Sequence, residues 1–314
     1  MTPDIQATGQ NFYGVTSSGG AFGWGTFFKM TVGGTLTTLY NFNLTEGATP
    51  VGALVLAANG NFYGAADVGG AMGYGAIFSI TPGGTLTTLH SFDYTTDGAN
   101  PIGGLIQAGD GNFYGTTTAG GTNGHGTVFR ITRSGKLTTL HSFTDSTDGA
   151  LPYAGLVQGT DGSFYGTTYE GGANGYGAIF SITSAGTLTT LHSFDTTGFE
   201  PFAGLVQATD GNFYGTTSLG GTNNSGTLFS LSVGLGPFVE TLPHFGKPGA
   251  AVRLLGTNLT GTSSVSFNGV TAAFTFGSPT EITTNVPVGA TTGKVQVITP
   301  GGLLLSGGPF LVRP

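Results

Sequence analysis

The feature that most constrains this chain is one segment that is written five times. A Phe-Tyr-Gly triplet recurs about every 50 residues, and self-similarity at that period is the signature of a propeller or a solenoid. The triplets begin at Phe12, Phe62, Phe113, Phe164 and Phe213. The repeat therefore predicts a chain built from five similar structural units.

Each repeat carries four strand signals. The fifth copy begins with the apolar run Leu205–Ala208, continues with Asp210-Gly211, and reaches the aromatic and β-branched segment Phe213–Thr217. Asp-Gly suits a two-residue hairpin turn that needs positive φ. Third and fourth strands are clearest at Val128–Thr132 and Leu86–His90. Four short strands in about 50 residues, with no helical period, predict one blade of an all-β propeller.

The repeat boundaries predict a five-bladed ring. The copies span residues 5–42, 53–92, 104–143, 155–194 and 205 to about 232. The fifth lacks a clean fourth strand, and Phe238–Leu242 is the nearest substitute. The chain could close with one strand fewer, borrow Phe238–Leu242, or belong to a longer array. We predict a closed five-bladed β-propeller over residues 1–236, since five blades lie within the range that propellers use.

One phenylalanine of the third strand is expected to hold the blades together. It recurs at Phe28, Phe78, Phe129, Phe180 and Phe229. We expect all five side chains to be buried between blades. A histidine of the fourth strand, at His90, His141 and His192, is interpreted as a half-buried packing residue, with Tyr40 as its counterpart in the first repeat.

Composition narrows the class of protein. Glycine is abundant, at 60 residues, but a hydrophobic fraction of 38% and 24 phenylalanines are enough for a core. Only 7% of residues are charged and the net charge is −7, which argues against a nucleic-acid partner because phosphate binding needs a basic surface. Cysteine is absent, so disulfides and thiolate metal sites are excluded. No apolar run reaches the roughly 18 residues of a membrane span.

The repeat resembles a known bacterial family. Its pieces GLVQATDGNFYGTT, GTVFxIT and GTLTTLHSF are similar to the GloVer tandem repeat of choice-of-anchor surface proteins, over about residues 5–236. That resemblance implies an extracellular or cell-surface location and brings no assigned activity. The strand order also resembles NHL-type blades, which would make the Leu205–Ala208 type strand the innermost. The low charge and the abundance of Thr, Ser, Gly and Asn likewise resemble exported bacterial proteins.

The repeat pattern ends near Pro237, and a different sequence pattern follows. The pieces GTNL, FNG, VPVGATTG and TPGG follow in that order between residues 256 and 302. They resemble an IPT/TIG domain, which implies an immunoglobulin-like β-sandwich over residues 237–314. Such domains serve as spacers or interaction modules, and we interpret this one as structural.

An aromatic series marks the first long loop of each repeat. Trp24, Tyr74, His125 and Tyr176 stand between glycines, and Ser225 breaks the series. Antiparallel up-and-down order places this loop on the same face as the connection to the next blade, and function in β-scaffolds usually sits on such loops. Flat side chains between flexible glycines could stack on sugar rings. They could equally fold down and cap the spaces between blades.

Acidic residues recur in the connection between blades. Asp93, Asp97, Asp145 and Asp148 precede Gly and Pro residues, a setting in which acids are mostly turn formers and caps. They are also the only calcium candidates, although Ca²⁺ needs six to eight converging oxygens and the spacing matches no calcium loop. No cofactor is expected.

Two further acids are the candidates for catalysis. Asp67 and Glu170 depart from the repeat on the same predicted face, and a glycosidase needs two carboxyl groups about 5 to 10 Å apart. Nothing in the local sequence pairs them, and solvated loop acids explain them equally well.

These observations favour an exported binding or adhesion protein whose partner is a polysaccharide or cell-surface glycan. The first alternative is a polysaccharide-active enzyme, either a hydrolase or a lyase, that uses the loop carboxylates. The second is a structural repeat protein that assembles through its incomplete fifth blade, which would make it a homo-oligomer.

Overall fold

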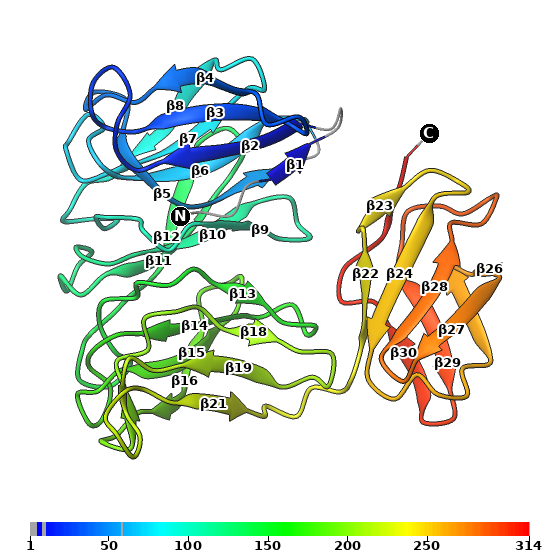
Figure 1. The fold of residues 1–314 in the computed structure, drawn as a ribbon. Helices are drawn as coiled ribbons and strands as arrows, with labels where there is room; N and C mark the ends of the chain where they lie inside the picture. The colour runs from blue at the N-terminus through cyan, green and yellow to red at the C-terminus, as the bar shows by residue number, and fades with distance from the viewer. Residues whose placement is uncertain (1–4, 8–10, 58, 314) are drawn as a thin grey trace. The chain divides into compact units, whose positions relative to one another are not determined.

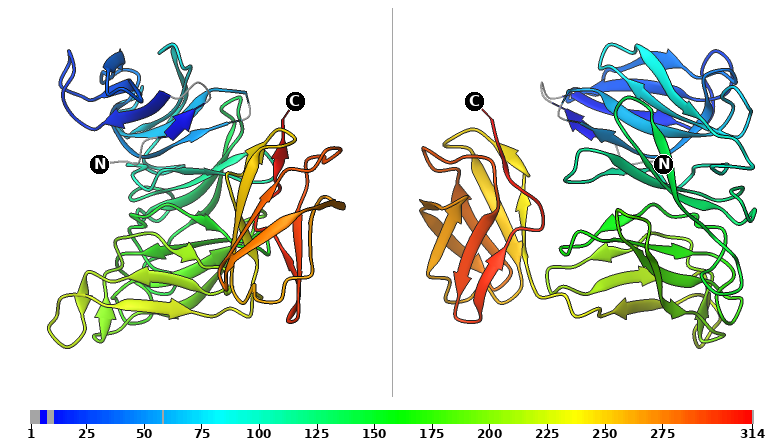
Figure 2. Two further views of the ribbon diagram at one scale, coloured as in Figure 1. Left: turned by 45° about the vertical axis from the view of Figure 1, so that its right-hand side comes forward. Right: turned by 180° about the vertical axis from the view of Figure 1, so that it is seen from behind.

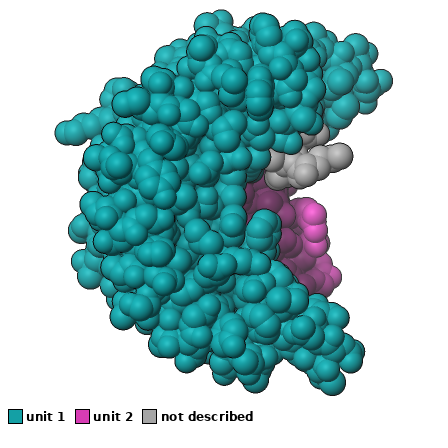
Figure 3. Space-filling view, turned by 90° about the vertical axis from the view of Figure 1, so that its left-hand side faces the viewer, with its two compact units in different colours: residues 1–158, 163–205, 215–229 teal, residues 159–162, 206–214, 230–314 magenta. Residues whose placement is uncertain are grey.

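The computed structural model describes residues 5–7, 11–57 and 59–313, and every regular element in them is a β-strand (Figure 1). The chain divides into two compact units, coloured in Figure 3. The first comprises residues 1–158, 163–205 and 215–229, and the second comprises 159–162, 206–214 and 230–314. No helix in the described residues is long and apolar enough to cross a membrane.

Four antiparallel meanders of four strands account for the first four repeats (Figures 1 and 2). The first sheet is β1 (Ile5–Ala7), β2 (Asn11–Thr16), β3 (Thr26–Thr31) and β4 (Leu36–Asn41). The second is β5 (Ala48–Leu56), β6 (Phe62–Val68), β7 (Ala76–Ile80) and β8 (Leu86–Ser91). The third is β9 (Leu105–Gln107), β10 (Phe113–Thr117), β11 (Thr127–Ile131) and β12 (Leu137–Ser142). The fourth is β13 (Val157–Gln158), β14 (Phe164–Thr168), β15 (Ala178–Ile182) and β16 (Leu188–Ser193).

The fifth sheet has three strands. They are β18 (Val206–Gln207), β19 (Phe213–Thr216) and β21 (Leu228–Leu231), while β17 (Gly198–Phe199) and β20 (Leu219–Gly220) form a separate short pair. The predicted substitute for the fourth strand is wrong, because β22 (Val239–Leu242) pairs with β24 (Ala251–Gly256) instead. Among the described strands, none of the fifth sheet pairs with one of the first, so strand pairing does not supply the ring closure that we predicted.

The second strand of each middle sheet is buried on both of its faces. All five residues of β10 and of β14 are buried, whereas a sheet with one solvated face alternates. One face of the second sheet presents Tyr63 and Ile77, which pack against Phe113, Phe129 and Ile131 of the third. We call these the tyrosine face and the phenylalanine face of a sheet.

This interface recurs along the chain. The Tyr63 and Phe113 rings stack with their centroids 4.2 Å apart, and Tyr114 and Phe164 stack at 4.0 Å between the third and fourth sheets. Tyr13 and Phe62 pack at 4.7 Å between the first and second. The tyrosine face of one sheet therefore covers the phenylalanine face of the next.

The prediction for the third-strand phenylalanines is correct for three of the five. Phe78, Phe129 and Phe180 are fully buried, but Phe28 and Phe229 are only half-buried. Phe28 lies on the first of the sheets that the structure describes. Phe229 lies on β21, which lacks the fourth strand that covers its counterparts.

The turn between the first two strands is longer than predicted. Ala108 N–H donates to the Asn112 carbonyl at 3.0 Å, and Gly111 N–H donates to the Ala108 carbonyl at 2.9 Å. Of the Asp110-Gly111 pair, only Gly111 has positive φ, at 81°. The loop therefore has three residues with glycine in the left-handed position, which is the second most common hairpin class.

Two four-stranded sheets enclose the core of the second unit. One is β22, β24, β28 (Glu281–Asn285) and β27 (Phe274–Ser278), and the other is β26 (Val270–Ala272), β25 (Ser264–Phe267), β29 (Val295–Thr299) and β30 (Gly302–Leu305). A parallel pair, β23 (Phe245–Gly246) and β31 (Leu311–Val312), completes the strands. Buried residues alternate along β24 and β25, so each sheet turns one face to the shared core.

Candidate functional site

The two long loops of each repeat meet at one end of the repeat sheets. Asn100 N–H donates to the carbonyl of Tyr74 at 2.9 Å, which ties the connection that follows a sheet to the β2–β3 type loop of the same sheet. The same bond links Thr49 to Trp24, Leu151 to His125, and Glu200 to Tyr176, at 2.9, 3.1 and 3.2 Å. The donor residue has positive φ in every copy. We call this end of the sheets the long-loop end.

The aromatic series lies at this end on backbone that is fixed in the same way in four repeats. Trp24 and Tyr74 are 38% and 43% exposed, and His125 and Tyr176 are half-buried. Tyr74 has Tyr94 beside it, with ring centroids 5.5 Å apart, and Tyr176 has Phe199 beside it at 5.1 Å. The two more exposed members of the series therefore belong to the first two repeats.

The glycine that follows each of these aromatics is required by close packing, which the sequence interpretation of flexible flanking glycines did not anticipate. Gly126, which follows His125, has φ of 93°, and a Cβ there would lie 2.3 Å from the Thr117 carbonyl oxygen and 2.9 Å from Cδ of Pro152. Gly124, which precedes His125, has φ of 82°, and a Cβ there would make only an ordinary contact with the Tyr94 hydroxyl oxygen, at 4.0 Å. The second glycine is thus required for close approach of the backbone, and it holds the aromatic residue in place.

A second aromatic cluster at the same end was not predicted. The rings of Tyr153 and Phe202 stack with centroids 5.1 Å apart, and Tyr169 meets Tyr153 edge-on at 5.1 Å. Phe202 is 58% exposed. The Tyr169 hydroxyl donates to a carboxylate oxygen of Glu200 at 2.8 Å, and this hydrogen bond raises the pKa of Tyr169. The sequence does contain a sign of this cluster. The residue after the proline of the connection between repeats is aromatic in two copies, at Tyr153 and Phe202.

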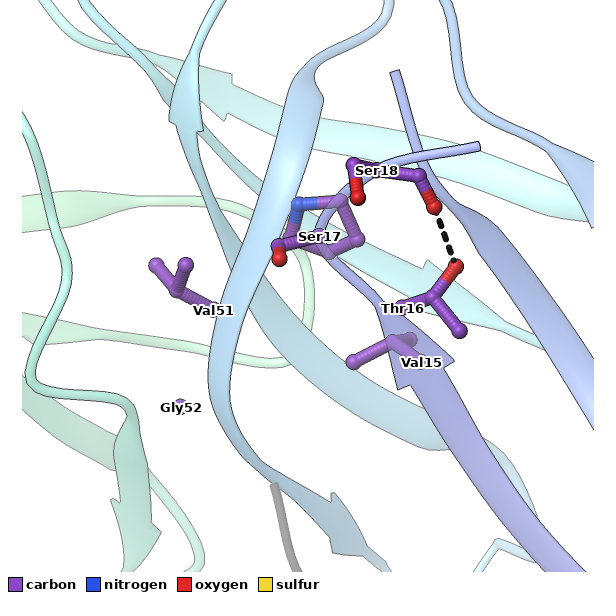
Figure 4. A pocket seen from close by; sticks show the side chains of 7 residues that line it. Val15, Thr16, Ser17, Ser18, Val51 and Gly52 are labelled. Carbon is purple, nitrogen blue, oxygen red and sulfur yellow. Dashed lines mark hydrogen bonds between the residues drawn. The ribbon is translucent and has the colours of Figure 1, made fainter. Parts of the chain in front are cut away.

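A hollow occupies the matching place between the first and second sheets (Figure 4). Val15–Ser18 and Pro50–Gly52 line a pocket of about 390 Å³. Figure 4 shows the Thr16 hydroxyl donating to the Ser18 carbonyl, at 2.9 Å, beside it. Ser17 and Val51 occupy the repeat positions of Tyr169 and Phe202. Small residues leave space there, whereas at the other junction large aromatics fill the same positions.

The two catalytic candidates have different surroundings. Asp67 is half-buried and accepts a hydrogen bond from the Asn100 side-chain amide at 3.1 Å. Glu170 is exposed, and its backbone pairs with Ala150. No hydrogen bond between described residues joins Asp67 to Glu170, and Asp67 accepts from an amide rather than pairing with a second acid.

The calcium candidates lie in the turns that connect the sheets. Asp97 accepts a hydrogen bond from His90 Nε2 at 2.6 Å, and Asp148 accepts one from His141 Nε2 at 2.6 Å. Asp93 accepts from the backbone N–H of Thr95 at 2.9 Å, and Asp145 pairs through its backbone with Gly149. In the parts of the chain that the structure describes, no three His, Asp or Glu side chains are grouped as metal ligands.

The histidine partners are a feature that the sequence interpretation missed. His90 and His141 each meet an acid seven residues later, in the connection that follows the fourth strand, whereas the residue seven positions after His192 is Phe199. Burial would raise the pKa of Asp148, but hydrogen bonds from Thr144 and the neighbouring His141 outweigh it and lower that pKa. In the first repeat Tyr40 donates to Glu46 in the same place, and burial together with that bond raises the pKa of Tyr40.

The chain belongs to the Gloeobacter/Verrucomicrobia repeat family, whose model matches residues 2–159 and 95–278. The match agrees with the family that the repeat resembles. No curated protein matches this sequence.

Several solved structures with propeller-like β-folds are similar to this chain at low identity. A candidate 6-phosphogluconolactonase from Bacteroides fragilis is 16% identical with a TM-score of 0.48, covering 95% of this chain and 90% of its own. An α-L-arabinofuranosidase from Clostridium thermocellum is 14% identical with a TM-score of 0.38, covering 68% and 80%. A Bacteroides thetaiotaomicron protein of unknown function is 16% identical with a TM-score of 0.45 and covers 70% of this chain, which spans 56% of that protein's length.

Proposed function

We propose that this protein is an exported bacterial surface protein that binds glycans through the long-loop end of its repeat sheets. The observation that carries the proposal is the exposure of Trp24 and Tyr74 on loops whose backbone is held by the same hydrogen bonds in four repeats. Aromatic faces offer a large apolar area and a weak attraction for polarised C–H groups, as on the face of a sugar ring. Rings that are already in position also lose little conformational freedom on binding.

The hollow and the inner aromatic cluster extend this binding surface. The pocket beside Ser17 and Val51 has space for a group of about one sugar ring, given its 390 Å³. Tyr153 and Phe202 add a second stacking surface, and the Glu200 carboxylate beside them accepts hydrogen bonds. We therefore assign Trp24, Tyr74, His125 and Tyr176 to ligand binding, with Tyr153, Tyr169 and Phe202 as additional contacts.

The wider architecture forms part of the proposal. We propose that the five sheets are the blades of a five-bladed propeller over residues 1–236, and that residues 237–314 are an IPT/TIG spacer. The family membership supports an origin in bacterial surface proteins. The two-sheet core of the second unit supports an immunoglobulin-like sandwich.

A glycan array followed by titration of the positive polysaccharides tests the proposal. Trp24→Ala is expected to weaken binding at least about fivefold, because one well-placed aromatic contact contributes about 1 kcal/mol. Its melting temperature is expected to stay near that of the wild type, since the ring is exposed. Phe276→Ala is the matched control, because Phe276 is 45% exposed on the second unit and should not affect binding. If Trp24→Ala loses much stability while its binding is unaltered, Trp24 is a packing residue and not a binding residue.

The enzyme alternative is tested on the same polysaccharides. The double variant Asp67→Asn with Glu170→Gln is expected to bind these polysaccharides as tightly as the wild type does. Its rate of polysaccharide cleavage is expected to be the same as that of the wild type. If the wild type cleaves a bound polysaccharide and the double variant does not, the protein is a polysaccharide-active enzyme and the binding proposal is wrong.

A further inference from the structure

The loops of the first two repeats carry most of the exposed apolar side chains of the long-loop end. Phe22 and Met72, at the same position of the β2–β3 and β6–β7 loops, are 61% and 60% exposed. Leu44 and Tyr94, at the same position of the connections after β4 and β8, are 48% and 39% exposed. Together with the two aromatic residues already described they form a set that we call the apolar platform: Phe22, Trp24, Leu44, Met72, Tyr74 and Tyr94.

Backbone hydrogen bonds join the loops that carry the platform. The Leu44 carbonyl accepts from Gly70 N–H at 2.9 Å, in the loop that carries Met72. Tyr74 follows in the same loop, and its ring centroid lies 5.5 Å from that of Tyr94. The connection after β4 is also bonded to the β2–β3 loop. The apolar side chains of two repeats therefore stand on one linked set of loops.

The same positions are polar in the third and fourth repeats. Asn123 and Asn174 take the place of Phe22 and Met72, and their side-chain amides donate to backbone carbonyls at the end of the fourth strand, at 3.1 and 3.0 Å. A polar residue can thus hold this loop, so the loop does not need an apolar one. The second repeat sheet packs against a sheet on each of its faces, so the exposure of Met72 is not that of an open edge.

The charges of the long loops restrict what can lie on the platform. In the first four repeats, the loops between second and third strands and the connections between sheets contain no lysine or arginine. They contain eight acids, which are Glu46, Asp93, Asp97, Asp145, Asp148, Glu170, Asp195 and Glu200. Carboxylate and sulfate groups are recognised by Arg and Lys, and like charges brought together oppose binding. This end of the sheets therefore disfavours an anionic polysaccharide.

We propose that the apolar platform binds an extended polysaccharide chain that carries no charged groups. The inference rests on the proposed glycan-binding function and narrows both its ligand and its place. An uncharged sugar ring presents C–H faces that pack on apolar and aromatic side chains, and its hydroxyl groups donate to carboxylates such as those of Glu46 and Asp93, which stand in the same connections as Leu44 and Tyr94. A phosphatidylcholine surface offers these carboxylates no donors. Because the platform spans two repeats, it fits several sugar units of one chain.

A glycan array tests the class of ligand. It holds neutral polysaccharides beside their carboxylated forms, such as hydroxyethylcellulose beside carboxymethylcellulose and amylose beside carboxymethyl amylose. We expect the uncharged forms to bind at least about tenfold more tightly at low salt, and their affinity to change less than about twofold up to about 0.5 M NaCl, since no ion pair is screened. A preference for the carboxylated forms would overturn the inference and leave glycan binding intact. Absence of binding to every polysaccharide would overturn the proposed function and this inference with it.

Substitutions taken from the later repeats test the platform itself. Phe22→Asn combined with Met72→Asn gives the first two loops the residue of the third and fourth, so folding should tolerate the change. The affinity for a positive polysaccharide is expected to fall at least about fivefold, because two large apolar side chains leave the contact. Val32→Asn is the matched control, because Val32 is 64% exposed in the turn after β3, at the opposite end of the sheet. Equal affinities of the double variant and the wild type would overturn the platform, whereas the proposed function would fail only if Trp24→Ala also bound equally.

Vesicles of phosphatidylcholine test the competing occupant. We expect the wild type not to sediment with them. Sedimentation with the vesicles that the double variant abolishes would assign the platform to a lipid surface and overturn the proposal.

Discussion

The repeat sheets and the C-terminal sandwich bury their strands in different ways. In β14 of the fourth sheet all five residues are buried, whereas in β24 of the sandwich buried and exposed residues alternate. A sandwich sheet needs one partner to complete its core, and it has that partner within the same unit. A middle repeat sheet needs a neighbour on both faces. The sandwich therefore encloses its core with two sheets of one unit, while the core of the repeat region is shared between successive sheets.

This difference also decides where ligands can bind. When both faces of a strand are covered, the side chains that reach solvent lie on the loops, as Trp24 and Phe202 do. On the sandwich, exposed apolar residues such as Phe276 and Leu303 lie on the strands themselves. The repeat sheets thus behave as a scaffold for a loop surface, which fits a binding function better than the sandwich does.

The largest expected effect separates the two regions by stability. Phe129→Ala should lower the free energy of unfolding of the repeat sheets by about 3–5 kcal/mol, because Phe129 is fully buried against Phe92. Leu254→Ala should cost the sandwich about 2–5 kcal/mol. Hydrogen exchange measured peptide by peptide should show faster exchange in β6 and β10 for the first variant and in β28 and β29 for the second. If each variant accelerated exchange equally in both regions, their independence would be refuted.

A smaller effect tests the rigid attachment of the loops. Gly126→Ala places a Cβ 2.3 Å from the Thr117 carbonyl oxygen, while the nearest atom to a Cβ at Gly124 is the Tyr94 hydroxyl oxygen, at 4.0 Å. Both changes incur the left-handed conformational cost of about 1–2 kcal/mol, and only Gly126→Ala adds a backbone clash. Chemical denaturation should therefore show a clearly larger loss for Gly126→Ala. Equal losses would mean that the loop shifts freely and that its backbone bonds do not fix His125.

The smallest expected effect is a dependence of stability on pH. Asp148 has a lowered pKa in the folded protein, so its contribution to stability is present above the usual carboxyl pKa and is lost as pH falls through the lowered value. Asp148→Asn should cost about 1–2 kcal/mol at pH 7, from the weakened bonds to His141 and Thr144. The difference from the wild type should shrink as acid protonates Asp148. Thermal melts between pH 7 and pH 2 measure this, and a difference that grew with acid would contradict the sign.

The sequence predicted the strands well because each is encoded locally. The Phe-Tyr-Gly triplet, its turn and the third-strand phenylalanine recur at fixed offsets, and each lies on a strand or turn of the expected order. The length of the Asp110-Gly111 turn was missed because the same dipeptide suits a two-residue or a three-residue hairpin. The sequence did not show which sheet Phe238–Leu242 joins, because a short segment with high β-propensity does not specify its pairing partner.

The site was harder to predict because its contacts join residues of different loops. Tyr169 reaches Glu200 through a connector in which Glu200 itself takes positive φ, at 58°. His90 reaches Asp97 through the turn after the fourth strand, in which the Asp97 N–H donates to the Asp93 carbonyl at 3.2 Å. Exposure is likewise a tertiary property: Trp24 and Tyr176 share one repeat position, yet only the first is well exposed. Local patterns identified the aromatic positions, and packing decided which of them face solvent.

The most direct test of ligand binding uses Trp24, because it is the only tryptophan of the chain. Its fluorescence reports on the long-loop end without a label. Titration with a glycan that is positive on an array should shift or quench the emission to a saturating value, with the same midpoint as binding measured by calorimetry. A glycan that binds by calorimetry while the emission of Trp24 stays unchanged, with equal affinity for Trp24→Phe and the wild type, would contradict the assignment of the binding surface.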